Sequence, residues 1–276
     1  MTRSGYSNHR LGAVLALAVA TLLAQSAVGS RTATVAPKAA IAAAVADPQR
    51  DPRNRLRDRY RHPAETLRFF GITPTRTVVE YQPGGGWYTE ILAPLLGARG
   101  RYIALGSAGA EDERSLREMV ARGGRRYGRV TIATIDEASG SSSVPDASVD
   151  VVLTFRNVHN LVMAGDGVAV ATLRGFHRML KPGGTLGIVD HRLPESFDSA
   201  METRSGYIKR STVIRVAQAA GFRLVGESMV NANPNDLHDW PKGVWSLPPA
   251  LAGEPRDRDK FLAIGESDRM TLKFVK

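Results

Sequence analysis

The sequence predicts a doubly wound α/β fold, in which a mostly parallel sheet of seven strands carries helices on both faces. Three observations support this prediction. Strand-like and helix-like runs alternate from residue 77 onward, and a glycine-rich turn joins the first strand to the first helix. The chain of 276 residues, 43% of them hydrophobic, is also long and apolar enough to bury a core of this size.

The predicted strands are short apolar runs bounded by turn residues. They cover residues 77–82, 101–106, 129–135, 148–155, 185–191, 222–230 and 269–275. The predicted helices between them cover 87–97, 111–123, 166–180 and 211–221. The third helix has one apolar face, formed by Ala169, Leu173, Phe176 and Leu180. Pro182 and two glycines end it, and Ser211 is the expected N-cap of the fourth.

The N-terminus has the pattern of a signal peptide at residues 1–29. Charged residues precede the apolar run 11–24, and small residues follow it, so cleavage is expected after Ser26 or Gly29, or as late as Ala46. We therefore expect a periplasmic or secreted protein. The alternative is an uncleaved anchor in the inner membrane. The absence of cysteine excludes disulfides and is compatible with export.

The next segment, residues 30–61, is expected to be an alanine-rich linker followed by an arginine-rich helix. Arginine recurs at every second or third position from 50 to 61, which favours a solvated helix over a patch for nucleic acid or anionic membrane. The net charge of +10 is partly carried by residues 1–46, which hold four bases and no acid. A dedicated nucleic-acid surface is therefore not expected. The remaining residues, 62–276, are expected to form one domain with a loop insertion at 231–268.

The turn after the first strand, "EYQPGGGWYTE", contains three consecutive glycines, which leave its backbone open to a ligand. A dinucleotide-binding turn needs the spacing G-x-G-x-x-G, but Thr89 stands where the third glycine belongs. The acid Glu80 at the end of the strand favours a different ligand. A cationic amino acid needs a carboxylate close to an open backbone, whereas a pyrophosphate does not.

This stretch resembles motif I of the class I S-adenosylmethionine-dependent methyltransferases. The segments 144–160 and 176–191 resemble the fourth strand, helix and fifth strand of the same superfamily. The combination of "PGGGWYT", "FRNVHN", "IVDH" and "IGESDRM" is similar to a group of predicted exported bacterial methyltransferases. The resemblance implies a Rossmann-like sheet of order 3-2-1-4-5-7-6 and S-adenosylmethionine as the cofactor.

The resemblance also implies a cofactor site at the carboxyl ends of the strands. Its residues are Glu80, Gln82, Gly84, Gly85, Gly86, Ser107, Asp136 and Arg156. Gln82 replaces a glycine of the usual motif. Ser107 stands near the position of the acid that holds the ribose hydroxyls, and Glu111 or Asp112 could reach in beside it. Asp136 matches the acid near the adenine amino group.

The same rim is expected to hold the groups that act on the acceptor. The candidates are His159, His191, Arg156 and Tyr207. Either histidine could serve as a base because imidazole titrates near neutrality. The alternative is that both histidines bind loop carbonyls. A metal site from His159, His191, His238 and Asp239 is not expected, because no close-spaced ligand pair is present.

We therefore expect a methyltransferase with an S-adenosylmethionine cofactor and a small-molecule acceptor. The alternative is a non-catalytic exported binding protein on the same fold, with a degenerate cofactor site, because the ribose-binding acid is missing. Aminopropyl or hydride transfer in the same pocket is a third possibility. The tryptophans of the insertion, Trp240 and Trp245, could close over a substrate or pack the loop.

Overall fold

The computed structural model describes residues 36–276, so the predicted signal peptide at 1–29 lies outside the described residues. The described part of the chain contains no helix with both the length and the apolar character needed to cross a membrane.

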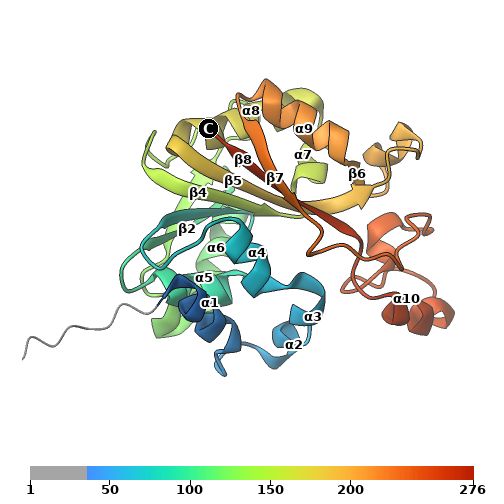
Figure 1. Ribbon diagram of the computed structural model, residues 1–276, viewed down its shortest axis with the longest axis horizontal. Coiled ribbons are helices and arrows are strands. Elements are labelled where there is room, and N and C mark those ends of the chain that lie inside the picture. Colours follow the sequence, from blue (N-terminus) through green and yellow to red (C-terminus); the bar gives the residue numbers. More distant parts are fainter. Residues whose placement is uncertain (1–35) are drawn as a thin grey trace, which may run out of the picture. The chain divides into compact units, whose positions relative to one another are not determined.

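An eight-stranded sheet forms the centre of the fold (Figure 1). Its strands are β1 (Thr77–Tyr81), β2 (Arg101–Ser107), β3 (Thr131–Ile135), β4 (Val149–Phe155), β5 (Leu180–Leu193), β6 (Ile208–Lys209), β7 (Arg223–Ser228) and β8 (Arg269–Val275). The order is β3-β2-β1-β4-β5-β8-β7, and the two-residue strand β6 pairs with the end of β5. β8 runs antiparallel to both its neighbours.

The predicted fold class and strand order are confirmed. All seven predicted strands are present, and the predicted sixth and seventh strands are β7 and β8. The strand missed by the sequence is β6, which is too short to show a period. The expected N-cap at Ser211 is wrong, since helix α9 begins at Arg210. Ser211 instead donates its backbone N–H and its hydroxyl to Glu195, at 3.0 and 2.6 Å.

Helices cover both faces of the sheet (Figure 1). They are α1 (Pro37–Ala46), α2 (Pro52–Arg55), α3 (Asp58–Arg61), α4 (Pro63–Phe69), α5 (Thr89–Leu96), α6 (Ala110–Arg122), α7 (Val158–Met163), α8 (Asp166–Met179), α9 (Arg210–Ala219) and α10 (Arg258–Ile264). One buried apolar cluster joins the sheet to α7, α8 and α9, and a second joins it to α1, α4, α5 and α6. This double packing explains why the central strands are apolar on both faces.

The segment before the first strand packs onto the domain. Residues 37–46, inside the expected linker, form α1, whose Ile41 is buried against the second cluster. The arginine-rich stretch forms the two short helices α2 and α3 rather than one. Arg50 is 1% exposed and makes two hydrogen bonds to Asp58, of 2.7 and 2.8 Å. The Trp87 indole N–H donates a 3.0 Å hydrogen bond to the Asn54 carbonyl, which holds the segment beside the glycine turn.

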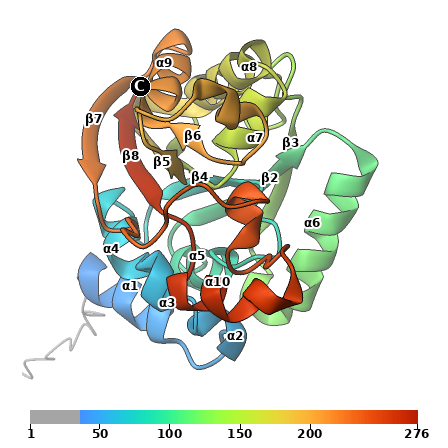
Figure 2. The same cartoon turned by 90° about the vertical axis from the view of Figure 1, so that its right-hand side faces the viewer.

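The insertion at 231–268 lies at the carboxyl ends of the parallel strands. Figure 2 looks toward this rim, with α10 in front. A third apolar cluster holds the insertion together and includes Tyr207, Trp240 and Phe261. Ligands of doubly wound sheets bind outside the carboxyl ends of the strands, so the insertion borders the expected site.

Candidate functional site

The glycine turn between β1 and α5 presents a bare backbone. Gln82, Gly84 and Gly86 have φ angles of +50°, +56° and +88°, in the left-handed region. A Cβ added at Gly84 or Gly85 would meet nothing within 4 Å, whereas one at Gly86 would lie 3.1 Å from Met119. Gly84 and Gly85 therefore leave room for a ligand, and Gly86 is needed for its conformation and packing.

Three cavities border this turn. One, of about 700 Å³, contacts Gly85 from the side of residues 48–54 and α6, and the other two, at the ends of the strands, have volumes of about 230 and 290 Å³. Gln82, Gly84 and Asn157 line both of them. The smaller cavity also contacts Asn54, Arg57, Arg61, Glu80, Trp87, Tyr88, Phe155 and Arg156. The larger one also contacts Tyr81, Glu137, Asn160 and Leu161. We call these two the Glu80 cavity and the Glu137 cavity.

Glu80 lies in the first of these cavities and is only 3% exposed. The Tyr102 hydroxyl donates a hydrogen bond of 2.6 Å to its Oε2, and Thr89 shares a second bond of 2.8 Å with that hydroxyl. Burial raises the pKa of Glu80 to about 7, although Tyr102 and the charge of Arg61 oppose the rise. A cation that enters the cavity would stabilise the ionised form of this carboxylate.

A polar network in and beside the Glu137 cavity joins the ends of β1, β2 and β3. The Gln82 side-chain amide donates a 2.7 Å hydrogen bond to the Ser107 hydroxyl. The hydroxyls of Ser107 and Tyr81 both donate to the Glu137 carboxylate. Sequence reasoning missed Glu137. The adjacent acids in "TIDEAS" were the available signal, but nothing local distinguishes which of the two faces the cavity.

Asp136, the neighbouring acid, lies outside both cavities. It is exposed, and its carboxylate accepts a 2.9 Å hydrogen bond from the Ser139 N–H in the following turn. Asp112 reaches toward the turn, with Oδ2 3.4 Å from the Gln82 amide nitrogen. Of the residues expected around the adenosine, Gln82 and Ser107 are therefore brought together with Glu137, and Asp136 is not.

Arg156 follows β4 and lines the Glu80 cavity. Its φ angle is +64°, which is costly for a side chain of this size, and its N–H donates a 2.7 Å bond to Val189. Among residues 36–276, no group accepts a hydrogen bond from its guanidinium. Burial lowers the pKa of Arg156 to about 9, and the positive charge of Arg61 contributes to the fall. An arginine held this way is typical of an anion-binding position.

Three further arginines surround Glu266 beside this cavity. Arg57, Arg61 and Arg269 form ion pairs with the Glu266 carboxylate at 2.6, 2.9 and 3.1 Å. Burial raises the pKa of Glu266, but Arg269, Arg61, Arg57 and Arg156 outweigh it and lower the pKa to about 2. Sequence reasoning missed this cluster, because Arg57 and Arg61 lie more than 200 residues before Glu266 and Arg269.

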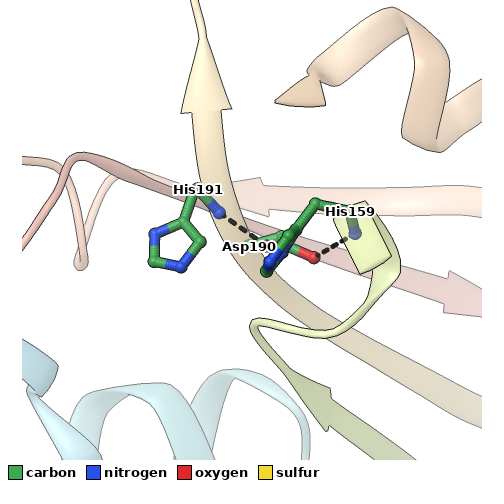
Figure 3. A group of neighbouring side chains, drawn as sticks. All are labelled: His159, Asp190 and His191. Carbon is green, nitrogen blue, oxygen red and sulfur yellow. Dashed lines mark hydrogen bonds and ion pairs between the residues drawn. The ribbon is translucent and has the colours of Figure 1, made fainter. Parts of the chain in front are cut away.

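His159 and His191 lie on either side of Asp190 (Figure 3). Asp190 accepts hydrogen bonds from His159 Nδ1 at 2.7 Å, from the His159 N–H at 3.0 Å and from the His191 N–H at 2.8 Å. His191 Nδ1 bonds the Ser267 hydroxyl at 2.5 Å. In both histidines Nδ1 forms a hydrogen bond within the protein, so Nε2 is the nitrogen left for another partner.

His159, Asp190 and His191 are also close enough together to hold a metal ion. Both oxygens of Asp190 already accept hydrogen bonds, and burial together with His159, Arg156, Arg269 and Arg61 lowers the pKa of His191 well below its usual value. The same arginines disfavour a cation. His238, also considered as a ligand, bonds Asp268 at 3.4 Å instead. A neutral His191 does not oppose a metal ion, but the arginine charge and the occupied Asp190 oxygens do. Both histidines are buried and, like Tyr207, line neither cavity.

Tyr207 is fully buried beneath the insertion and lines neither cavity. Its hydroxyl donates to Asp236 at 2.8 and 2.9 Å, and the Trp240 indole N–H donates to the same carboxylate at 2.7 Å. Trp240 packs against Phe261, and Trp245 is 37% exposed. The contacts of Tyr207 and Trp240 hold the insertion together. Of these three aromatic residues, Trp245 is the one that a ligand in solvent could reach.

No family model matches this chain, and no curated protein resembles it in sequence. Solved structures do share its fold. A S-adenosylmethionine-dependent methyltransferase from Aquifex aeolicus aligns with a TM-score of 0.55 and 18% identity, over 82% of this chain and 93% of that one. The chain has the class I methyltransferase fold.

Two other structures show how widely this fold is used. A candidate sarcosine dimethylglycine methyltransferase from Galdieria sulphuraria aligns with a TM-score of 0.53 and 14% identity, over 77% of this chain and 82% of that one. The 4+2 cyclase SpnF aligns with a TM-score of 0.52 and 15% identity, over 81% and 80%. The fold therefore does not fix the reaction, which must be argued from the site.

Proposed function

We propose that this protein is a S-adenosylmethionine-dependent methyltransferase with a small-molecule acceptor. The observation that carries the proposal is the Glu80 cavity, where one buried carboxylate and the Arg57 and Arg61 side chains face the open backbone of the glycine turn. An amino-acid group offers an ammonium to the carboxylate and a carboxylate to a guanidinium. This donor set fits the methionine end of the cofactor.

The Glu137 cavity supports the same assignment for the adenosine end. Glu137 and Ser107 would accept hydrogen bonds from the ribose hydroxyls, a role in which Glu137 replaces the acid missing from β2. The hydrogen bonds from Tyr81, Gln82 and Ser107 fix these acceptors before a ligand binds. Preorganised acceptors lose little conformational entropy on binding.

When bound, S-adenosylmethionine supplies an electrophilic methyl group. His159 would take the proton of the acceptor at Nε2, because Asp190 accepts the hydrogen bond from Nδ1 and stabilises the imidazolium. Arg156 would orient the acceptor. His191 is held neutral and would act as a hydrogen-bonding partner rather than as a second cation.

Calorimetric titration of the full chain with S-adenosylmethionine and S-adenosylhomocysteine tests this proposal. We expect saturable binding with a Kd below about 1 mM, and a Kd at least about 100-fold higher in Glu80→Ala. Glu118→Ala, which alters an exposed acid of α6, is the matched control and should bind like the wild type. Absence of binding in the wild type would refute the proposal.

A second candidate is a binding protein without methyl transfer. Within residues 36–276 the guanidinium of Arg156 has no acceptor, which favours this candidate, since an anionic ligand alone would satisfy that group. This candidate predicts binding of an anion but not of S-adenosylhomocysteine. The two titrations therefore distinguish it from the enzyme.

We also propose that the chain is exported, with a domain that begins at α1. The packing of Ile41 supports cleavage after Ser26 or Gly29, because cleavage after Ala46 would remove α1 and uncover the apolar surface beneath it. Cell fractionation and N-terminal sequencing of the mature protein test this. A mature chain that starts at residue 47 would contradict it, and an intact N-terminus in the membrane fraction would indicate an anchor.

A further inference from the structure

The arginines around Glu266 carry more positive charge than their acidic partners can balance. Arg57, Arg61 and Arg269 share the single Glu266 carboxylate, at 2.6 to 3.1 Å. Arg156 adds a fourth positive charge close enough to lower the pKa of Glu266. The Glu80 carboxylate is nearby but has a pKa of about 7, so it is only partly ionised at neutral pH.

Several guanidinium nitrogens in this cluster lack an acceptor. In the part of the chain that the structure describes, the Nη2 atoms of Arg57 and Arg61 and the Nε atom of Arg269 are buried without a hydrogen-bond partner. Both Arg57 and Arg61 line the Glu80 cavity, as does Arg156. Arg61, at 4% exposed, gains some compensation from the Trp87 ring, whose centroid lies 4.7 Å from its guanidinium carbon. No ring in the described residues lies beneath Arg156 in this way.

Buried, unpaired donors on charged groups are costly, and proteins keep them where a ligand completes them. The cofactor alone would not do so. This step rests on the proposed function: the methionine end brings one carboxylate, but it also brings an ammonium and a sulfonium. The site would therefore remain strongly positive with the cofactor in place.

We propose that Arg156, beside Arg57 and Arg61, binds an oxyanion carried by the acceptor, either a carboxylate or a phosphate. The planar guanidinium presents two parallel N–H donors that match the oxygens of either group. Arg156 follows β4 and lies three residues before His159, so an acceptor held by its oxyanion would lie at the same rim as the candidate base. The acceptor class is thus a small organic acid or phosphate ester.

The test uses full-length protein and two probes, inorganic phosphate and acetate, titrated by calorimetry at constant ionic strength set with chloride. Each titration is made with free protein and with protein saturated with S-adenosylhomocysteine. We expect at least one probe to bind in both states. Arg156→Gln should weaken that probe at least about 10-fold while changing the Kd for S-adenosylhomocysteine by less than about 3-fold.

Arg101→Gln is the matched control, because Arg101 is exposed at the opposite end of β2 and should change neither Kd. Arg156→Lys keeps the charge without the planar fork and should weaken the probe by an intermediate factor, while thermal unfolding verifies that both variants fold. The probe that binds, phosphate or acetate, identifies which oxyanion the acceptor carries.

Three results separate the two proposals. If S-adenosylhomocysteine binds but neither probe binds the complex, the oxyanion site is refuted and the proposed function stands. The oxyanion site is also refuted if the probe and S-adenosylhomocysteine compete for the protein, because the arginines would then bind the carboxylate of the cofactor. If a probe binds but S-adenosylhomocysteine does not, the methyltransferase proposal fails, and with it the acceptor role of this site.

Discussion

The Glu80 cavity and the Glu137 cavity are built on different physical principles. The Glu80 cavity is lined by buried charges, and its arginines share too few acidic partners. The Glu137 cavity is lined by neutral donors and one acid that already accepts two hydrogen bonds. The first cavity requires a charged ligand to complete it, whereas the second needs only a ligand that can replace or join existing hydrogen bonds.

This difference predicts different responses to mutation. A change in the Glu80 cavity leaves an uncompensated buried charge, so it should affect folding as well as binding. A change in the Glu137 cavity alters partly solvated hydrogen bonds and should affect mainly binding.

Glu266→Gln should have the largest effect. It removes the carboxylate that pairs with Arg57, Arg61 and Arg269, and loss of one partner in a buried ion pair costs about 3–5 kcal/mol. Urea denaturation measures the free energy of unfolding. Glu227→Gln is the control, because Glu227 pairs with Arg210 on the surface and should cost less than about 1 kcal/mol. Equal losses in both variants would contradict the contrast between buried and exposed pairs.

The ionisation of Glu80 should make stability depend on pH. Its pKa is about 7 when folded and 4.5 in its ordinary state, so the folded protein retains this proton between these pH values while the unfolded chain releases it. The free energy of unfolding should therefore fall by about 3 kcal/mol from pH 4.5 to above pH 7, relative to Glu80→Gln.

The difference between wild type and Glu80→Gln, measured by urea denaturation across this pH range, isolates the contribution of Glu80 from other groups. Parallel curves would show that Glu80 does not titrate there. Binding of S-adenosylhomocysteine should strengthen over the same interval, because the ionised carboxylate is the form that pairs with an ammonium.

Glu137→Gln should have a smaller effect, limited to the second cavity. It keeps the shape of the side chain but removes the charge that accepts from Tyr81 and Ser107, so we expect about 10-fold weaker binding of S-adenosylhomocysteine, or about 1.4 kcal/mol. Calorimetry measures the Kd, and urea denaturation should show little change. Unaltered affinity would remove Glu137 from the proposed ribose site.

Asp136→Asn should have the smallest effect. Asp136 is exposed and its carboxylate bonds the Ser139 N–H, so the Kd for S-adenosylhomocysteine should change by less than about 2-fold. A larger loss than in Glu137→Gln would restore the role first expected for Asp136 and would mean that the turn rearranges when a ligand binds.

The sequence by itself determined the fold class and the glycine turn, whereas the strand order was implied by its resemblance to class I methyltransferases. Each of these depends on local patterns: apolar runs specify the buried strands, glycines specify positive φ angles, and Glu80 is recognisable because it ends a strand directly before the turn. The strand that sequence analysis missed, β6, has only two residues and therefore shows no alternation of apolar and polar positions.

Only the tertiary structure decided the electrostatics of the site. Arg57 and Arg61 precede the sheet, Arg156 follows β4, and Glu266 and Arg269 lie at the last strand, so no sequence period relates them. The choice of Glu137 over Asp136 likewise depends on where a turn points, and the partner of Tyr207 depends on how the insertion folds back. Local preferences set backbone geometry, but the charge that a cavity carries is a sum over residues that only the folded chain brings together.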